Sequence, residues 1–199
     1  MIRLQLRTGF TQRRSLILGA AAACIEPWGL AEAHAAAGPV APPQAIPVIA
    51  VTSTGGQSIE LSRLLTGGIT AVQTMFTGCT ATCPIQGAIF ADVQRHLGPA
   101  DTNLRLLSVS IDPLGDDARA LRTWLGRFDA QPQRWRAAVV RMSDVDRLLD
   151  FLRSRADGPD RHTAQAFLFN SKAQLAFRTT DLPTGNDVAN LMREMASMR

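Results

Sequence analysis

Residues 69–84 have the sequence ITAVQTMFTGCTATCP, in which an apolar run leads directly into a pair of cysteines. The run from Ile69 to Phe76 is nearly continuous, as expected of a buried central strand. Proline suits the first turn of a helix, because its missing N–H would have no partner there. Pro84 therefore predicts that Cys83 starts a helix and that Cys79 lies on the loop before it. This strand–loop–helix order indicates an α/β fold with two sulfurs at the end of a strand.

Two sulfurs at a helix start can act on the same chemical target. The positive end of the helix dipole favours the thiolate form of cysteine. Thiolates exchange with disulfides, and they also bind soft metal ions such as Cu(I). The residues by themselves leave redox exchange and metal binding both open. Cys79 and Cys83 could instead be small buried hydrophobes, an interpretation that the strand before them and the proline after them disfavour.

The composition indicates one globular domain without a nucleic-acid-binding surface. The chain has 199 residues, 46% of them hydrophobic, which is enough for one domain with a real core. The net charge of +4 comes from scattered arginines rather than from a basic block, so we expect no nucleic-acid partner. Three cysteines are too few for a disulfide scaffold.

Residues 1–35 have the features of an export signal. Arg13 and Arg14 precede an apolar stretch over residues 16–25, and Ala33-His34-Ala35 offers a cleavage site. The paired arginines resemble a twin-arginine signal, and the apolar stretch is shorter than the ~20 residues of a membrane span. We therefore expect an extracytoplasmic (periplasmic) protein that contacts a membrane only if this segment is retained as an anchor. Attachment of a lipid at Cys24 is one alternative.

The remaining sequence predicts an Ala/Pro-rich linker over residues 36–47 and one domain over residues 48–199. Strands alternate with helices before a closing hairpin, which indicates an α/β/α sandwich with a mixed sheet and an N-terminal β-hairpin extension. The expected strands are 48–52, 57–61, 69–76, 104–111, 135–140, 166–169 and 174–177. Helices are expected after Pro84 (Ile85, Ile89, Val93 and Leu97 inward), after Asp116-Asp117 (Ala118, Leu121, Leu125 and Phe128 inward), after a Ser143 cap, and over 186–197.

Three segments together resemble the SCO/SenC copper-binding proteins of the thioredoxin superfamily. The family pattern is C-x-x-x-C-P, then S-x-D-P, then a histidine before the penultimate strand. The matching segments, within residues 46–198, are FTGCTATCP (76–84), SVSIDP (108–113) and Arg161-His162-Thr163. The resemblance implies a thioredoxin-like fold.

The resemblance also implies a copper site, with Cys79, Cys83 and His162 binding one copper ion as Cu(I) or Cu(II). It implies delivery of copper to, or thiol reduction of, the dinuclear copper site of cytochrome c oxidase subunit II. Chemistry agrees with this ligand set, because thiolates select Cu(I) and imidazole suits either oxidation state. We expect a monomeric carrier, not a turnover enzyme, whose partners are subunit II or another copper-site protein and thiol–disulfide exchange proteins.

The alternative is an extracytoplasmic thiol–disulfide oxidoreductase or peroxidase that uses the same cysteine pair. Its weakness is the C-x-x-x-C spacing, because thioredoxin-type enzymes use C-x-x-C. A redox or copper sensor that signals by docking is a third possibility, but the sequence offers no specific feature that supports it.

The sequence departs from the family pattern in three places. Thr80-Ala81-Thr82 stands where members commonly have Pro and Asp, and Arg161 stands where an acidic residue often precedes the histidine. Asn170-Ser171-Lys172-Ala173 replaces the usual D-P-x-G turn. None of these residues is an expected ligand, but Arg161 leaves the surroundings of the histidine and the docking surface open.

Other potential donors are expected to be structural. His96 should place a favourable charge at the end of a helix, and Met192, Met195 and Met198 fit core packing and a frayed helix end. Asp112 is expected to turn the chain after its strand and to face the metal pocket at most, without being a ligand.

Overall fold

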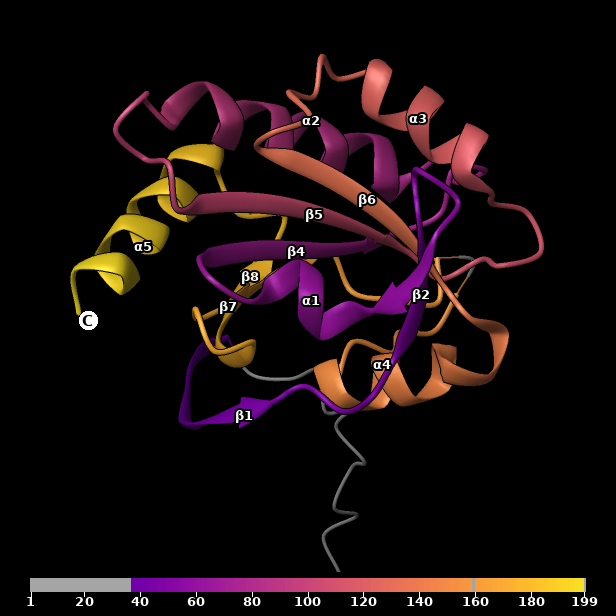
Figure 1. The fold of residues 1–199 in the computed structure, drawn as a ribbon, viewed down its shortest axis with the longest axis horizontal. Coiled ribbons are helices and arrows are strands. Elements are labelled where there is room, and N and C mark those ends of the chain that lie inside the picture. Colours follow the sequence, from indigo (N-terminus) through magenta and orange to yellow (C-terminus); the bar gives the residue numbers. More distant parts are fainter. Residues whose placement is uncertain (1–36, 159, 199) are drawn as a thin grey trace, which may run out of the picture. The chain divides into compact units, whose positions relative to one another are not determined.

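The fold is built on one mixed sheet with helices on both faces (Figure 1). The computed structural model describes residues 37–158 and 160–198. Within these residues the sheet has eight strands in the order β1-β8-β7-β4-β5-β6-β2-β3. The elements are β1 (Gly38–Ala45), β2 (Ala50–Ser53), β3 (Ser58–Glu60), α1 (Leu61–Leu65), β4 (Ile69–Met75), α2 (Thr82–His96), β5 (Leu104–Ser110), α3 (Ala118–Gly126), β6 (Trp135–Val140), the 3-10 helix η1 (Met142–Asp144), α4 (Val145–Leu152), β7 (Gln165–Phe169), β8 (Gln174–Asp181) and α5 (Gly185–Ser197).

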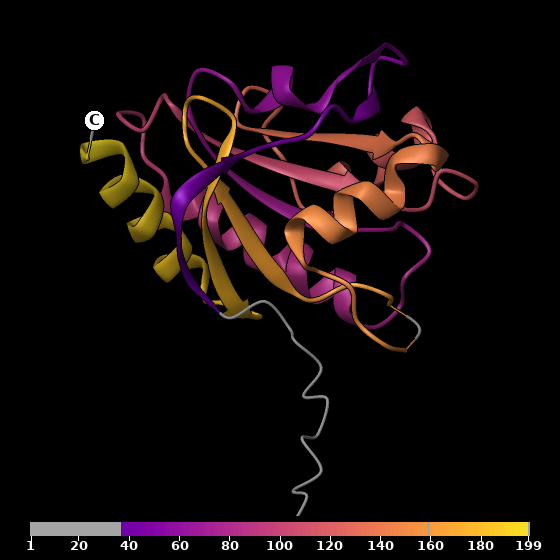
Figure 2. The same ribbon diagram turned by 90° about the horizontal axis from the view of Figure 1, so that it is seen from below.

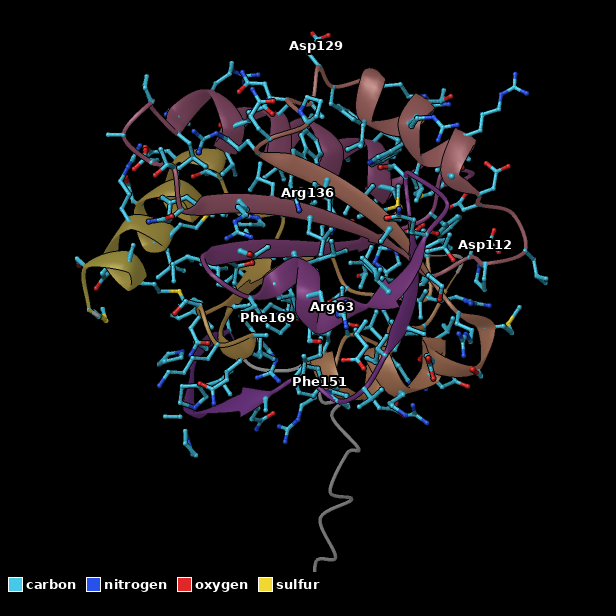
Figure 3. All side chains as sticks on the ribbon, viewed as in Figure 1. Arg63, Asp112, Asp129, Arg136, Phe151 and Phe169 are labelled. Carbon is cyan, nitrogen blue, oxygen red and sulfur yellow. The ribbon has the colours of Figure 1, made fainter. Side chains whose placement is uncertain are left out.

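Alternation along the central strands divides the core into two layers. On one face, Ile69 and Ala71 of β4 pack with side chains of α2 and α5. On the other face, Val72 packs with side chains of α1 and α4. Phe151 of α4 and Phe169 of β7 show this second layer, with ring centroids 6.4 Å apart (Figure 3). The mixed α/β sandwich expected from the alternating elements is confirmed.

The centre of the sheet is parallel, and this determines where the chemistry lies. Strand β4 pairs parallel with β5, and β5 pairs parallel with β6, whereas β7 pairs antiparallel with β4. The carboxyl ends of β4, β5 and β6 therefore meet at one edge of the sheet. In α/β sheets this edge carries the binding residues, and the cysteines follow β4 directly.

The proline-rich segment before the domain contradicts the prediction of a linker over residues 36–47. Residues Gly38–Ala45 form the edge strand β1, which pairs antiparallel with β8. Proline cannot donate to a ladder and is tolerated on an edge strand, and the register is irregular between Pro39 and Gln44. The predicted domain start at residue 48 stays untested, and the export signal lies outside the described residues.

The expected hairpins are confirmed, but two local predictions are wrong and one short helix was missed. Ile85 was expected to face inward from α2 but is 50% exposed. The buried residues of this helix are instead Cys83, Gln86, Gly87, Phe90, Val93 and Gln94. The helix α4 buries Val145, Leu148, Leu149 and Leu152 but begins after Asp144 rather than at a Ser143 cap. The short helix α1 was not predicted. No helix within the described ranges is long and apolar enough to cross a membrane.

Candidate functional site

Cys79 lies between β4 and α2, and Cys83 lies in the first turn of α2; we call residues 76–83 the cysteine loop. Met75 ends the strand and Thr82 begins the helix, so the predicted strand–loop–helix order is confirmed. Both cysteines are free and buried, with Cys79 6% and Cys83 0% exposed. The backbone N–H of Cys83 donates to Sγ of Cys79 over 3.4 Å, so the first sulfur lies against the start of the helix.

Asp116 ties the cysteine loop to the neighbouring strand. Its carboxylate accepts hydrogen bonds from the backbone N–H of Thr77 (3.0 Å), from the Thr77 hydroxyl, and from the hydroxyl of Ser110 at the end of β5 (2.6 Å). The sequence predicts a helix-start role for both Asp116 and Asp117, but only Asp117 caps α3, by accepting from the backbone N–H of Ala120. The anchoring role of Asp116 was missed.

The histidine reaches the cysteines from the segment between α4 and β7. We call its described residues, 153–158 and 160–163, the histidine loop (Figure 2). His162 Nε2 lies 3.7 Å from Sγ of Cys83. The edge of its ring meets the ring of Phe76, with centroids 6.2 Å apart and an interplanar angle of 88°. The structure therefore brings together Cys83 and His162, which are 79 residues apart in the chain.

Hydrogen bonding identifies the protonated nitrogen of this imidazole. Nδ1 of His162 lies 2.9 Å from the carbonyl oxygen of Thr163. A carbonyl only accepts, so Nδ1 carries the proton, and the free electron pair of Nε2 faces Cys83. His162 is 3% exposed, and burial lowers its pKa, which keeps the ring neutral at neutral pH. A neutral imidazole with its Nε2 pair directed at a sulfur is in the state needed to bind a metal.

Burial also governs the thiol of Cys83. Loss of hydration raises its pKa well above the usual range, against the lowering effect of a hydrogen bond from the backbone of Phe76. The helix dipole therefore does not make Cys83 a thiolate here, contrary to the expectation from its position at the helix start. The thiol proton must leave when a metal binds, and the metal–sulfur bond must offset the burial of the charge.

Asp160 is a site residue that the sequence did not predict. Its carboxylate accepts hydrogen bonds from Sγ of Cys79 (3.2 Å) and from the hydroxyl of Thr82 (2.5 Å). These two bonds, from Thr82 first and then from Cys79, hold the pKa of Asp160 below its usual range. The missing acidic neighbour of His162 thus lies one residue earlier than the family pattern places it. The Asp160-Arg161-His162 order was the available signal.

The donors of the predicted set lie in adjacent pairs rather than in a finished coordination shell. Cys83 contacts both Cys79 and His162, while Cys79 also bonds Asp160. No group of three His, Cys, Asp or Glu side chains within residues 37–158 and 160–198 is already arranged around one metal position. The donor chemistry, two thiols and a neutral imidazole side by side, fits a soft ion. Binding by all three would require Cys79 to leave Asp160.

A cavity of about 190 Å³ opens beside the histidine and is lined by Phe76, Ile111, Asp112 and Arg161. Asp112 lies on the loop after β5, at the edge of the sheet where β4 ends (Figure 3). Its backbone turns the chain as expected, with the N–H of Gly115 donating to its carboxylate. Arg161 adopts a left-handed φ of 57°, and it is exposed where it lines the cavity.

The remaining potential donors lie elsewhere. His96 lies 3.6 Å from Asp92 on the exposed side of α2. Met192 of α5 packs in the same core layer as side chains of α2. Both placements agree with the structural roles expected for these residues.

Comparison with known proteins identifies the family. The SCO1/SenC family profile matches residues 50–197, well over half of the chain. A SCO1 protein homolog of Bacillus subtilis (strain 168) is 26% identical over 80 residues, which span 40% of this chain and only 41% of that relative. The structure of yeast Sco1 with copper bound has a TM-score of 0.66 at 14% identity, covering 79% of this chain and 91% of that chain. The structure of BsSco has a TM-score of 0.67 at 17% identity, covering 79% and 96%.

The family profile spans the cysteine loop, the histidine loop and every strand of the sheet except β1. The fold is thioredoxin-like, as the resemblance in the sequence implies. Because the family profile covers every element from β2 to α5, the chain belongs to the SCO1/SenC family.

Proposed function

We propose that this protein is a copper carrier that takes up one copper ion as cargo through Cys79, Cys83 and His162. The observation that carries the proposal is the 3.7 Å approach of His162 Nε2 to Cys83 Sγ, with Cys79 directly beside Cys83. Family membership supports it, and so does the copper described for yeast Sco1. If His162 and the two cysteines had no common function, nothing would explain why the acceptor nitrogen of a buried imidazole is directed at a sulfur.

The donor set suits release as well as binding. Two thiolates and one imidazole leave a copper ion with few ligands, so a partner's thiols can exchange with them. Cys79 exchanges its hydrogen bond to Asp160 for the copper ion as the cargo enters, and Asp160 stays beside the site, held by Thr82. Because the thiol protons must leave, affinity for copper weakens as pH falls.

The proposed recipient is the dinuclear copper site of cytochrome c oxidase subunit II. BsSco is described as a member of a family of cytochrome c oxidase assembly proteins, which supports this recipient without identifying it. The export signal predicted over residues 1–35 places the exchange outside the cytoplasm, where cysteine pairs can also be oxidised. Delivery therefore requires that the pair be reduced first.

An anaerobic titration with Cu(I) in competition with a chromophoric chelator tests the proposal. The reduced chain should bind one equivalent, Cys79→Ser and Cys83→Ser should lose tight binding, and His162→Ala should bind more weakly. His96→Ala is the matched control, because this histidine lies on the exposed side of α2 and should leave binding unchanged. Equal binding by the wild type and both cysteine variants would refute the carrier function.

Thiol–disulfide exchange is the second candidate, supported by the contact between Cys79 and Asp160. A carboxylate that accepts the thiol proton would help Cys79 to attack a partner's disulfide. Cys83 would then displace the partner, so that two thiols here become one disulfide while the partner's disulfide becomes two thiols. Catalytic reduction of a model disulfide, together with no tight copper binding, would favour this function over the carrier.

A further inference from the structure

Trp124 carries a hydrogen-bond donor, unpartnered within the described ranges, in the cluster of buried side chains that contains the sulfurs. Its side chain is 1% exposed, and its indole Nε1 has no hydrogen-bond partner among the described residues. Trp124 belongs to a cluster of buried side chains with Met75, Cys79 and Cys83. Burial of an N–H without a partner is costly, and native proteins rarely keep such a group. The donor therefore calls for a partner in another state of the protein.

The indole is held where it is by a row of aromatic rings. Trp124 packs edge-on against Phe128, with centroids 4.9 Å apart, and Phe128 stacks on Trp135 at 6.0 Å. Phe128 fits there because α2 has a glycine at position 87, where a Cβ would collide with the ring. The contacts with these rings hold the indole of Trp124 beside the cysteine loop, where it is buried from water.

A second tryptophan in the same row shows the usual arrangement. Trp135 is 0% exposed, but its Nε1 donates to the hydroxyl of Ser108 over 2.9 Å. The two indoles differ in what lies beside them: Trp135 has an oxygen acceptor, whereas Trp124 has sulfur neighbours. A neutral thiol is a weak acceptor, but a metal-bound thiolate carries negative charge and accepts strongly.

We propose that the indole N–H of Trp124 is a hydrogen-bond donor to the thiolate sulfur of Cys79 or Cys83 when copper is bound. Among the described residues the donor has no partner, so copper binding supplies one and the indole favours the loaded state. This assignment rests on the proposed function of the cysteines. Trp124 is a positioning residue that acts on the ligand sulfur rather than on the metal.

The test compares Trp124→Phe with Trp135→Phe in the full chain. Both variants lose the same ring volume, so the difference between them isolates the two N–H groups. For Trp124→Phe we expect a Cu(I) dissociation constant about tenfold higher, the size of one hydrogen bond to a charged acceptor. The thiolate-to-Cu(II) charge-transfer band should also move to lower energy, because the sulfur loses a donor. Trp135→Phe should leave both unchanged.

The stability of the metal-free protein should fall more in Trp135→Phe than in Trp124→Phe, the reverse of the order expected for copper affinity. Trp135→Phe removes one of the two bonds that the hydroxyl of Ser108 accepts, the other coming from the side-chain amide of Gln73. It should therefore unfold more easily than Trp124→Phe, which removes a donor without a partner among the described residues. A measurement on the wild type avoids any loss of folding in the variants. On loading with Cu(I), the indole N–H proton resonance of Trp124 should move downfield, and that of Trp135 should stay in place.

The outcomes separate the two proposals. Suppose that the wild type binds copper, that Trp124→Phe has the same copper affinity and charge-transfer energy as the wild type, and that the Trp124 resonance does not move. This result would overturn the role of Trp124 alone. A wild-type chain that binds neither Cu(I) nor Cu(II) would overturn the carrier function and the role of Trp124 together.

Discussion

The cysteine loop and the histidine loop meet at one site but are held by different means. The cysteine loop is short and buries both of its sulfurs, and the Asp116 carboxylate anchors it to the end of β5. The histidine loop passes through left-handed conformations at Arg153 (φ 53°) and Arg161 (φ 57°). Its side-chain ties to α4 are ion pairs of Arg155 with Asp146 and Asp150, in which the arginine side chain is 49% exposed.

This difference separates stability from site geometry. A buried carboxylate with several donors is costly to remove, whereas an exposed ion pair contributes little. Changes to the anchor of the cysteine loop should therefore weaken the fold and the site together. Changes to the ties of the histidine loop should leave the fold nearly intact. A carrier needs both properties, because the sulfurs must hold the ion while another ligand gives way.

Removal of the anchor should have the largest effect. In Asp116→Ala, the N–H and hydroxyl of Thr77 and the hydroxyl of Ser110 lose their acceptor in a buried place. We expect the free energy of unfolding to fall by about 2–4 kcal/mol. The affinity for Cu(I) should fall as well, because Cys79 follows Thr77 closely. Urea denaturation and chelator competition measure the two effects.

The adjacent carboxylate is the control for this experiment. Asp117 caps α3 from an exposed position and has no bond to the cysteine loop. Asp117→Ala should reduce stability less and leave copper affinity unchanged. If both aspartates gave equal losses of affinity, the anchor would not distinguish the two loops.

The cysteine side of the site could be predicted because its information is local. An apolar strand, a four-residue spacing and a proline are adjacent in the sequence, and together they determine where the two sulfurs lie. The layer beneath was mispredicted, since apolar periodicity favoured Ile85 and Ile89. The buried face instead carries Gln86 and Gly87, and the reason for the glycine is the ring of Phe128, which follows the end of α3 and is distant in the sequence.

A methyl group at position 87 should have the next largest effect. A Cβ there would collide with the Phe128 ring, which cannot retreat because it lies between Trp124 and Trp135. Although alanine favours helix more than glycine does, Gly87→Ala should lose about 1–3 kcal/mol of stability through overpacking. Gly126→Ala in α3 is the matched control, because its Cβ would meet nothing within 4 Å and should stabilise. Thermal unfolding of both variants decides between the two effects.

The histidine side could not be predicted in detail, because it depends on the path of a loop. Left-handed conformations at two arginines have no signal in residue type, since glycine or asparagine usually takes them. That path brings Asp160 to Cys79 and leaves Arg161 exposed at the cavity. The family pattern supplied His162 but placed the acidic neighbour one residue too late. Strand β1 was missed for a related reason, because prolines argue against a strand except at an edge.

Protonation should affect the histidine side before it affects the cysteine side. Burial lowers the pKa of His162 in the folded protein, so below about pH 6.5 the unfolded chain takes up a proton more readily. The stability from this residue is therefore complete above that pH and is lost as pH falls toward the folded pKa. Urea denaturation at about pH 7.5 and about pH 5.5 should show the loss, and His162→Gln should reduce it. An unchanged loss in His162→Gln would assign it to other groups.

At high pH the cysteine loop should become the weaker side. The pKa of Cys83 is raised by burial, so above about pH 8.5 the unfolded chain releases the thiol proton while the folded protein retains it. Stability from this residue is present below that pH and is lost as pH rises further. Cys83→Ala should flatten the decline above pH 8.5 without changing the decline on the acid side.

The smallest effect should come from the exposed tie of the histidine loop. Arg155→Ala removes the ion pairs with Asp146 and Asp150, which lie in water at the surface of α4. We expect a slight fall of the urea midpoint at low salt that disappears at high salt, because exposed pairs are screened. Backbone bonds, such as that from the N–H of Thr163 to the carbonyl of Ser154 (2.8 Å), remain in place. Copper affinity should therefore change less than in Asp116→Ala. A loss of stability as large as that of Asp116→Ala would mean that both loops are rigidly anchored, and release of the cargo would then need another moving part.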